Sequence, residues 1–117
     1  MAHVEHFEIP ADDVERAQRF YERVLGFRYE RWDDDMGMIL PPSERGIGGD
    51  IHRRSDLAHP TVVFTVDDIE ETVALAVEHG GEQIGEIQPL GEKDRWVYVR
   101  DSEGNTVGLF DHGGATA

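Results

Sequence analysis

The chain carries the same pattern of one helix and four strands twice, and this internal repeat limits its fold more than any other feature. The first copy contains Phe7-Glu8-Ile9 and Asp12-Asp13-Val14-Glu15, and the second contains Phe64-Thr65-Val66 and Asp67-Asp68-Ile69-Glu70. In each copy a strand pattern leads into a helix, and three further strand patterns follow. A module of about 55 residues is too small to bury its own sheet face alone. We therefore expect one α+β domain over residues 1–117, made of two tandem βαβββ modules.

Breaks in the hydrophobic pattern set the expected limits of the elements. Module one covers about residues 1–56 and module two about residues 57–112, followed by a short tail over 113–117. Strand patterns occupy residues 3–9, 27–32, 36–40, 47–53, 61–66, 83–87, 96–100 and 106–110. The helices are expected to begin after an aspartate cap and to end at a glycine. The first helix is expected to begin after Asp12 or Asp13 and to end at Gly26. The second is expected to begin after Asp67 or Asp68 and to end at Gly80-Gly81. Pro10 is expected to end the first strand.

The composition excludes several classes of function. The chain has 25 acidic and 11 basic residues, a net charge of −14, and no cysteine. Such an acidic surface repels nucleic-acid phosphates and anionic membranes. Without cysteine there is no disulfide, thiolate nucleophile or cysteine-ligated metal. No apolar run is long enough to span a membrane, and the N-terminus lacks the layout of a signal peptide, so we expect a cytoplasmic protein.

Strand alternation predicts which side chains lie on the sheet face opposite the helices. Phe7 and Ile9 are expected to pack under the first helix. His6 and Glu8 then point to the opposite face. The same parity adds to that face Asp50, His52, Trp96, Tyr98, Arg100 and Phe110. Aromatic side chains around convergent ionisable groups are typical of a small-molecule site. The alternative is that the aromatic residues only pack the junction between two half-sheets.

His6 and Glu8 are the catalytic candidates. A histidine titrates near neutral pH, so His6 could be a metal ligand or a general base, or else a hydrogen-bonded histidine that lines the face. A carboxylate in partly apolar surroundings has a raised pKa, so Glu8 could carry a proton. The alternative for Glu8 is a structural ion pair with Arg100 or another arginine. Asp50 and His52 form a second possible acid–base or ligand pair, and they count as substrate-binding candidates with the aromatic residues.

Several segments together carry a family resemblance. They are His6-Phe7-Glu8-Ile9-Pro10-Ala11-Asp12-Asp13, Arg19-Phe20-Tyr21, Val24-Leu25-Gly26-Phe27, Phe64-Thr65-Val66-Asp67-Asp68-Ile69 and residues 99–109. On these residues the chain resembles the vicinal oxygen chelate superfamily, which includes glyoxalases, fosfomycin and bleomycin resistance proteins and ring-cleaving dioxygenases. The resemblance implies a curved mixed sheet that encloses a cup, with the helices on its outer face. It also implies a homodimer.

The resemblance further implies a metal site to which this chain only partly conforms. Metal-dependent members take ligands from the first and fourth strands of both modules. His6 matches the first ligand position, and Asp50 lies at or within one residue of the second. Thr61 and Gly108 occupy the third and fourth, where His and Glu are typical. Since a divalent ion needs three or four protein ligands, both a metal site (Ni, Zn, Mn or Fe) at His6 and Asp50 and a metal-free site stay open.

Two functions follow as alternatives. The first is an enzyme of unassigned reaction, a lyase, isomerase or dioxygenase, that binds or transforms a small oxygenated metabolite. The second is a non-catalytic protein that sequesters an aromatic or drug-like ligand between Trp96, Tyr98 and Phe110. Both predict a small-molecule ligand and neither involves nucleic acid or a membrane.

Overall fold

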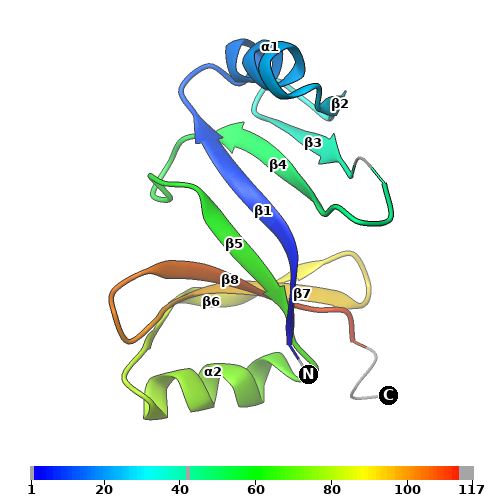
Figure 1. Cartoon of the computed structure of the whole chain (residues 1–117). Helices are drawn as coiled ribbons and strands as arrows, with labels where there is room; N and C mark the ends of the chain where they lie inside the picture. The colour runs from blue at the N-terminus through cyan, green and yellow to red at the C-terminus, as the bar shows by residue number, and fades with distance from the viewer. Residues whose placement is uncertain (1, 42, 114–117) are drawn as a thin grey trace. The chain divides into compact units, whose positions relative to one another are not determined.

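The structure, a computed structural model, describes residues 2–41 and 43–113 (Figure 1). The first half contains β1 (His3–Ala11), α1 (Val14–Leu25), β2 (Arg28–Arg31), β3 (Met36–Leu40) and β4 (Gly48–Arg53). The second half contains β5 (Thr61–Thr65), α2 (Ile69–Glu78), β6 (Glu82–Leu90), β7 (Asp94–Arg100) and β8 (Thr106–Asp111). The order strand, helix, three strands therefore occurs twice, and the α+β class is confirmed.

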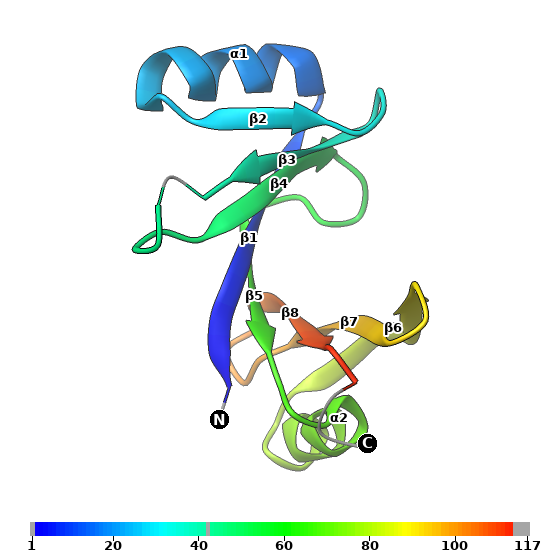
Figure 2. The ribbon, with the colours of Figure 1, turned by 90° about the vertical axis from the view of Figure 1, so that its right-hand side faces the viewer.

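The chain divides into two compact units, which are described separately. One is Glu5–Thr61, and the other comprises Met1–Val4 and Val62–Ala117, within the described residues. The sheet order is β2-β3-β4-β1 in the first unit and β6-β7-β8-β5 in the second. In each unit the first strand pairs in parallel with the last, and the remaining pairs are antiparallel. Each helix covers one face of its own sheet (Figures 1 and 2).

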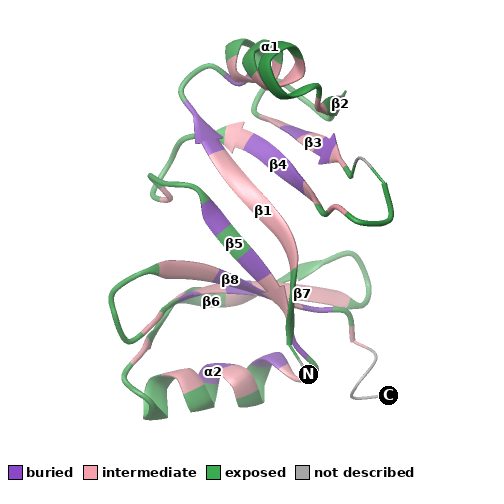
Figure 3. Ribbon diagram, viewed as in Figure 1, coloured by how far each residue is buried: buried purple, intermediate pink, exposed green. Residues whose placement is uncertain are grey.

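Each unit buries its core between its helix and its sheet. In the Glu5–Thr61 unit the buried cluster is Ala11, Val14, Ile39 and Ile51, with Phe7 and Ile9 packed against it. In the other unit the buried cluster is Val66, Ile69, Val73, Val97, Val99 and Leu109. The buried stretches of β3, β4, β7 and β8 are visible in Figure 3. The alternation predicted for Phe7 and Ile9 is therefore confirmed, and the opposite faces of both sheets are left for other side chains.

The first helix begins and ends through local hydrogen bonds. The Asp13 carboxylate accepts a 3.0 Å bond from the Arg16 N–H, which satisfies one of the free amides of the first turn. Gly26 ends the helix with φ +72°, and its N–H donates to the Glu22 carbonyl at 3.0 Å. Glycine adopts this left-handed conformation without strain, because it has no Cβ. Of the two possible caps, the structure therefore selects Asp13.

The second helix is held by two carboxylates. Asp68 accepts a bond from the Glu71 N–H at 3.0 Å and acts as the cap. Asp111, at the end of β8, accepts the Ile69 N–H at 3.0 Å and is 1% exposed. This second contact ties the start of α2 to the sheet. Within the described residues, neither helix is long and apolar enough to cross a membrane.

Three strands are longer than predicted by more than one residue. β7 begins at Asp94 and not at residue 96, because Asp94 pairs with Leu90 of β6. β1 continues through Pro10 to Ala11, because proline lacks only its N–H and the strand still pairs along β4, where Ala11 accepts the Arg54 N–H at 2.8 Å. β6 is longer than the predicted 83–87, because a register shift between Ile84 and Gln88 lets it resume pairing with β7. The register shift is a bulge next to Gly85 at φ +76°.

Candidate functional site

The parallel pairing of β1 with β4 brings the first group of predicted site residues together. In this register Glu8 lies opposite Asp50, and Ile9 lies opposite Ile51. Ile51 is fully buried in the core under α1, so alternation places Asp50 on the other face of the sheet. His6 and His52 share that face, two positions from Glu8 and Asp50 along their strands. We call His6, Glu8, Asp50 and His52 the polar cluster.

Asp50 is the centre of the polar cluster. Its carboxylate is 2% exposed, and each of its oxygens bonds to a different imidazole. Oδ2 lies 2.7 Å from Nε2 of His6, and Oδ1 lies 2.8 Å from Nδ1 of His52. Both histidines are partly buried, with 24% and 18% of their side chains exposed. A buried carboxylate is stable only when paired and hydrogen-bonded, and the two imidazoles provide both.

These contacts shift the pKa of all three groups. Burial alone would raise the pKa of Asp50, but hydrogen bonds from His52 and His6 hold it below its usual value. Burial alone would lower the pKa of His6, but the hydrogen bond to Asp50 and the nearby carboxylates raise it. The hydrogen bond to Asp50 also raises the pKa of His52, with burial opposing it. The cluster thus favours an ionised Asp50 beside protonated imidazoles.

The contribution of the polar cluster to stability is expected to depend on pH. The raised pKa of His6 and His52 means that their contribution is fully present below about pH 6.5, their unfolded value, and is lost as pH rises through the folded pKa. The lowered pKa of Asp50 gives a contribution present above about pH 3.8 and lost as pH falls through its folded value.

Urea unfolding across this range tests the expectation in metal-free protein. The loss of unfolding free energy in His52→Gln, relative to the unsubstituted chain, should be largest near pH 5–6 and should shrink toward pH 9. The same loss at all pH values would contradict the assigned protonation states. His79→Gln is the matched control, because His79 is exposed on the C-terminal end of α2.

Three members of the polar cluster could hold a metal ion. One ligand atom from each of His6, Glu8 and Asp50 lies within 4.8 Å of the others. His52 is outside this group and contacts the other oxygen of Asp50. Sequence reasoning placed His6 and Asp50 in the metal site and Glu8 in proton transfer. The structure adds Glu8 to the possible ligands, so all three come from the Glu5–Thr61 unit.

The close backbone approach expected at Gly48-Gly49 is present. A Cβ added to Gly49 would lie 2.8 Å from the Phe7 ring and against its carbonyl oxygen. No side chain fits there, because a real Cβ essentially never comes so near to another atom. Glycine therefore lets β4 approach β1 closely next to Asp50.

The remaining predicted site residues belong to the other unit. Trp96 and Tyr98 lie on β7 in an edge-to-face contact, with ring centroids 5.6 Å apart. Phe110 on β8 pairs in register with Trp96 and packs on the ring of His112 at 4.8 Å. Val97 and Leu109 lie in the core under α2, so these aromatic side chains occupy the opposite face. They form one aromatic face on this sheet.

Arg100, Thr61 and Gly108 have local structural partners. Arg100 donates to the Glu82 carboxylate at 2.8 Å, on the neighbouring strand β6. Thr61 is buried, and its hydroxyl donates to the His59 carbonyl at 3.2 Å. A Cβ added to Gly108 would lie 3.0 Å from a methyl group of Val63. These contacts give Thr61 and Gly108 structural roles at the positions where the family resemblance predicts ligands.

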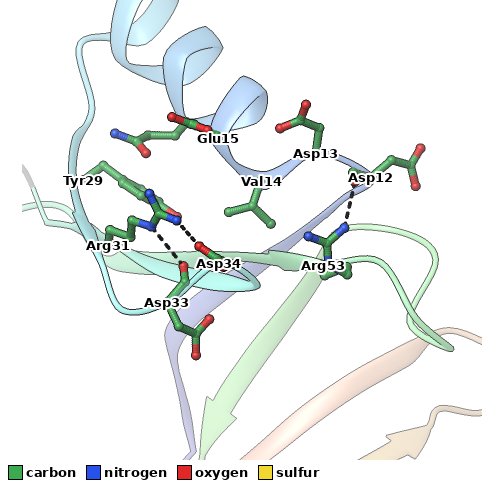
Figure 4. Close-up of a pocket in the computed structure, with 10 residues that line it drawn as sticks. Asp12, Asp13, Val14, Glu15, Tyr29, Arg31, Asp33, Asp34 and Arg53 are labelled. Carbon is green, nitrogen blue, oxygen red and sulfur yellow. Dashed lines mark hydrogen bonds and ion pairs between the residues drawn. The ribbon is translucent and has the colours of Figure 1, made fainter.

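A cavity of about 390 Å³ lies elsewhere, between the start of α1 and the β2–β3 turn (Figure 4). Its walls are Asp12, Asp13, Val14, Glu15, Gln18, Tyr29, Arg31, Asp33, Asp34 and Arg53. Arg31 pairs with Asp34 within the walls, whereas Arg53 donates to the Asp12 backbone carbonyl at 3.2 Å and pairs with Asp35, which does not line the cavity. No member of the polar cluster lines this cavity. Sequence reasoning did not predict it, since only folding brings these loops together.

Comparison with known proteins identifies the family. The sequence model of the Glyoxalase/Bleomycin resistance protein/Dioxygenase superfamily matches residues 3–109. The chain belongs to this superfamily. A glyoxylase-like domain-containing protein of Didymella fabae is 27% identical in an alignment of 114 positions, and the match covers 85% of each chain. The superfamily membership predicted from the sequence motifs is therefore confirmed.

Solved structures share the fold. A superfamily member from Vibrio splendidus 12B01 superposes with a TM-score of 0.68 at 18% identity, covering 95% of this chain and 99% of that one. A methylmalonyl-CoA epimerase variant of Streptomyces coelicolor superposes with a TM-score of 0.66 at 14% identity, covering 96% and 95%. At these identities the similarity establishes the fold and leaves the reaction to the residues of the site.

Proposed function

We propose that this superfamily member binds a divalent metal ion through His6, Glu8 and Asp50 and uses it to bind or transform a small oxygenated metabolite. The observation that carries the proposal is the group of three ligand atoms within 4.8 Å of one another. One imidazole and two carboxylates suit Zn, Mn, Fe or Ni. Three protein ligands also leave coordination positions open for a substrate.

Two of the donor atoms would have to move apart to hold an ion. Ligand atoms that bind a tetrahedral ion at about 2.1 Å lie roughly 3.4 Å apart. His6 Nε2 and Asp50 Oδ2 are 2.7 Å apart, because they share a proton. Binding of an ion by both residues would replace that proton and would require the two atoms to separate by roughly 0.7 Å. Partly exposed His6 can make this movement, whereas buried Asp50 stays held by His52.

The residues around the ion would orient and protonate the substrate. A bound ion supplies Lewis-acid polarisation of substrate oxygens. Asp50 holds Nδ1 of His52 and leaves Nε2 as the nitrogen that can take up or release a proton. A carboxylate that fixes one imidazole nitrogen in this way sets the tautomer and the orientation of the ring.

Metal titration of chelator-treated protein tests the proposal. Calorimetry with Zn²⁺, Ni²⁺, Mn²⁺ and Fe²⁺ should give one site per chain for at least one ion. His6→Ala should weaken it at least about 100-fold, since a ligand is lost rather than a supporting group. His79→Ala is the matched control and should bind like the unsubstituted chain. Failure of all four ions to bind, or equal affinity in His6→Ala, would contradict the proposal.

A second function, sequestration of an aromatic ligand, is favoured by the aromatic face of the other unit. Trp96, Tyr98 and Phe110 lie on adjacent strands on one face of the sheet. In a Trp32→Phe background, Trp96 is the remaining tryptophan and reports on this face alone. Quenching by an aromatic probe such as 1-naphthol, lost in Tyr98→Ala and retained in His6→Ala, would support sequestration. No quenching would exclude it for that class of ligand.

A further inference from the structure

The sheet face that carries the polar cluster continues onto β3 with apolar side chains. In the antiparallel pairing of β3 with β4, Met38 lies opposite Asp50 and Met36 lies opposite His52. Ile39 is 3% exposed in the core under α1, so alternation turns Met36, Met38 and Leu40 to the opposite face. We call these three residues the apolar strip. Adjacent strands are about 4.8 Å apart, so the strip directly borders the polar cluster.

The apolar strip is accessible on this face. Its three residues are all partly exposed, whereas Gly37 and Ile39 between them are buried. The chain continues into the strip from Trp32, whose N–H donates to the Met36 carbonyl at 3.1 Å. Trp32 is 59% exposed. Methionine is common at adaptable binding surfaces, because its unbranched thioether side chain is flexible and polarisable.

We propose that the apolar strip binds the apolar substituent of a small molecule whose oxygen atoms bind the metal at the polar cluster. This inference rests on the proposed function and names its substrate class: a compact oxygen chelator with an uncharged apolar group, such as a phenyl or branched alkyl. The methionines contact that group, and the ligand lies across β4 from the metal toward β3.

The charges in the row of Met38 favour an uncharged substituent at that position. Glu30 lies opposite Met38 on the far side, and Glu8 lies opposite Asp50 on the near side. The cation of this face on β2, Arg28, lies opposite Leu40 at the end of the strip and donates to the Pro41 carbonyl at 3.0 Å. A ligand that lies across this row is flanked by carboxylates at both ends. An anionic substituent in this row would be repelled. A polar substituent would lose its hydrogen bonds to water and gain only the weak acceptor of a thioether sulfur. An apolar group gains by leaving water.

Two hydroxamates test the inference in the metal-loaded protein. Acetohydroxamate and benzohydroxamate present the same pair of oxygen atoms to a metal and differ in their substituent. Benzohydroxamate should bind the Ni²⁺-loaded protein about tenfold more tightly or better, because its ring is buried against the strip. Met38→Ala and Met36→Ala should reduce this ratio at least threefold, while the affinity for acetohydroxamate changes by less than twofold. Comparing ratios removes any difference in chelating strength between the two probes.

Two further variants separate contact from general structural effects. Met38→Leu keeps the volume and apolar character and should retain the ratio. Leu25→Ala removes an exposed apolar side chain from α1, which covers the opposite face of the same sheet, and should leave both affinities unchanged. An unchanged ratio in both methionine-to-alanine variants would overturn the apolar strip and leave the metal site standing. If neither hydroxamate binds the Ni²⁺-loaded protein, this inference fails, whereas failure of every tested ion to bind would overturn the proposed function.

Discussion

Asp50→Asn is expected to lower the affinity for a divalent metal by at least about 100-fold. Asp50 supplies one of the three possible ligand atoms and bonds to both imidazoles, at 2.7 and 2.8 Å. Asparagine keeps the shape but removes the charge, and its amide NH₂ is a donor that faces a ring nitrogen. The substitution therefore removes a ligand and disturbs the orientation of His6 and His52 together.

The same substitution should also change the titration of the histidines. Without the Asp50 charge, burial is left as the largest influence on His6, and it lowers the pKa. NMR titration of the ring signals should show a lower pKa for His6 and His52 in Asp50→Asn than in the unsubstituted chain. Asp101→Asn, in an exposed turn, is the control and should change neither metal affinity nor these pKa values. Wild-type metal affinity in Asp50→Asn would contradict the assigned centre.

Asp111→Ala is expected to lower the free energy of unfolding by about 2–4 kcal/mol. Asp111 is 1% exposed and accepts hydrogen bonds from the backbone N–H groups of Ile69 and Gly113, at 3.0 and 2.6 Å. Burial alone would raise the pKa of this carboxyl, but these N–H donors and Arg95 hold it below its usual range. Alanine leaves the first amide of α2 buried without its acceptor, and Arg95 keeps only Glu70.

Asp68→Ala provides the matched comparison for this helix. Asp68 caps α2 from a more exposed position through one N–H bond at 3.0 Å, so its loss should cost about 1 kcal/mol. Urea unfolding of both variants measures the difference. If Asp111→Ala costs no more than Asp68→Ala, the buried carboxylate does not hold the helix to the sheet as described.

Much of the fold could be predicted because it depends on local patterns. Alternation at Phe7 and Ile9 assigned the faces of β1, and the glycine at position 26 marked the end of α1. Asp111 could not be singled out among 25 acidic residues, because its burial depends on the packing of α2 against the end of β8. Pro10 was wrongly predicted to end β1, because only the pairing with β4 shows that the missing N–H is tolerated.

The sheet face on which the candidate site residues lie could be predicted, but their grouping could not. Strand parity placed His6, Glu8 and Asp50 on one face, yet only the parallel register brings Glu8 opposite Asp50. The resemblance implied ligands at the positions of Thr61 and Gly108, so Glu8 was not predicted as a third metal ligand. Met36 and Met38 were not predicted as site residues, because only the pairing of β3 with β4 makes them neighbours of the polar cluster.

The central claim is that a divalent metal replaces the proton shared by His6 and Asp50. Side-chain ¹⁵N NMR of the histidines during Zn²⁺ titration tests this most directly. One equivalent of Zn²⁺ should move the Nε2 signal of His6 to the range of a metal-bound imidazole and leave Nδ1 of His52 protonated and bonded to Asp50. Histidine signals that stay unchanged at saturating Zn²⁺, or a metal shift confined to other histidines, would contradict the account.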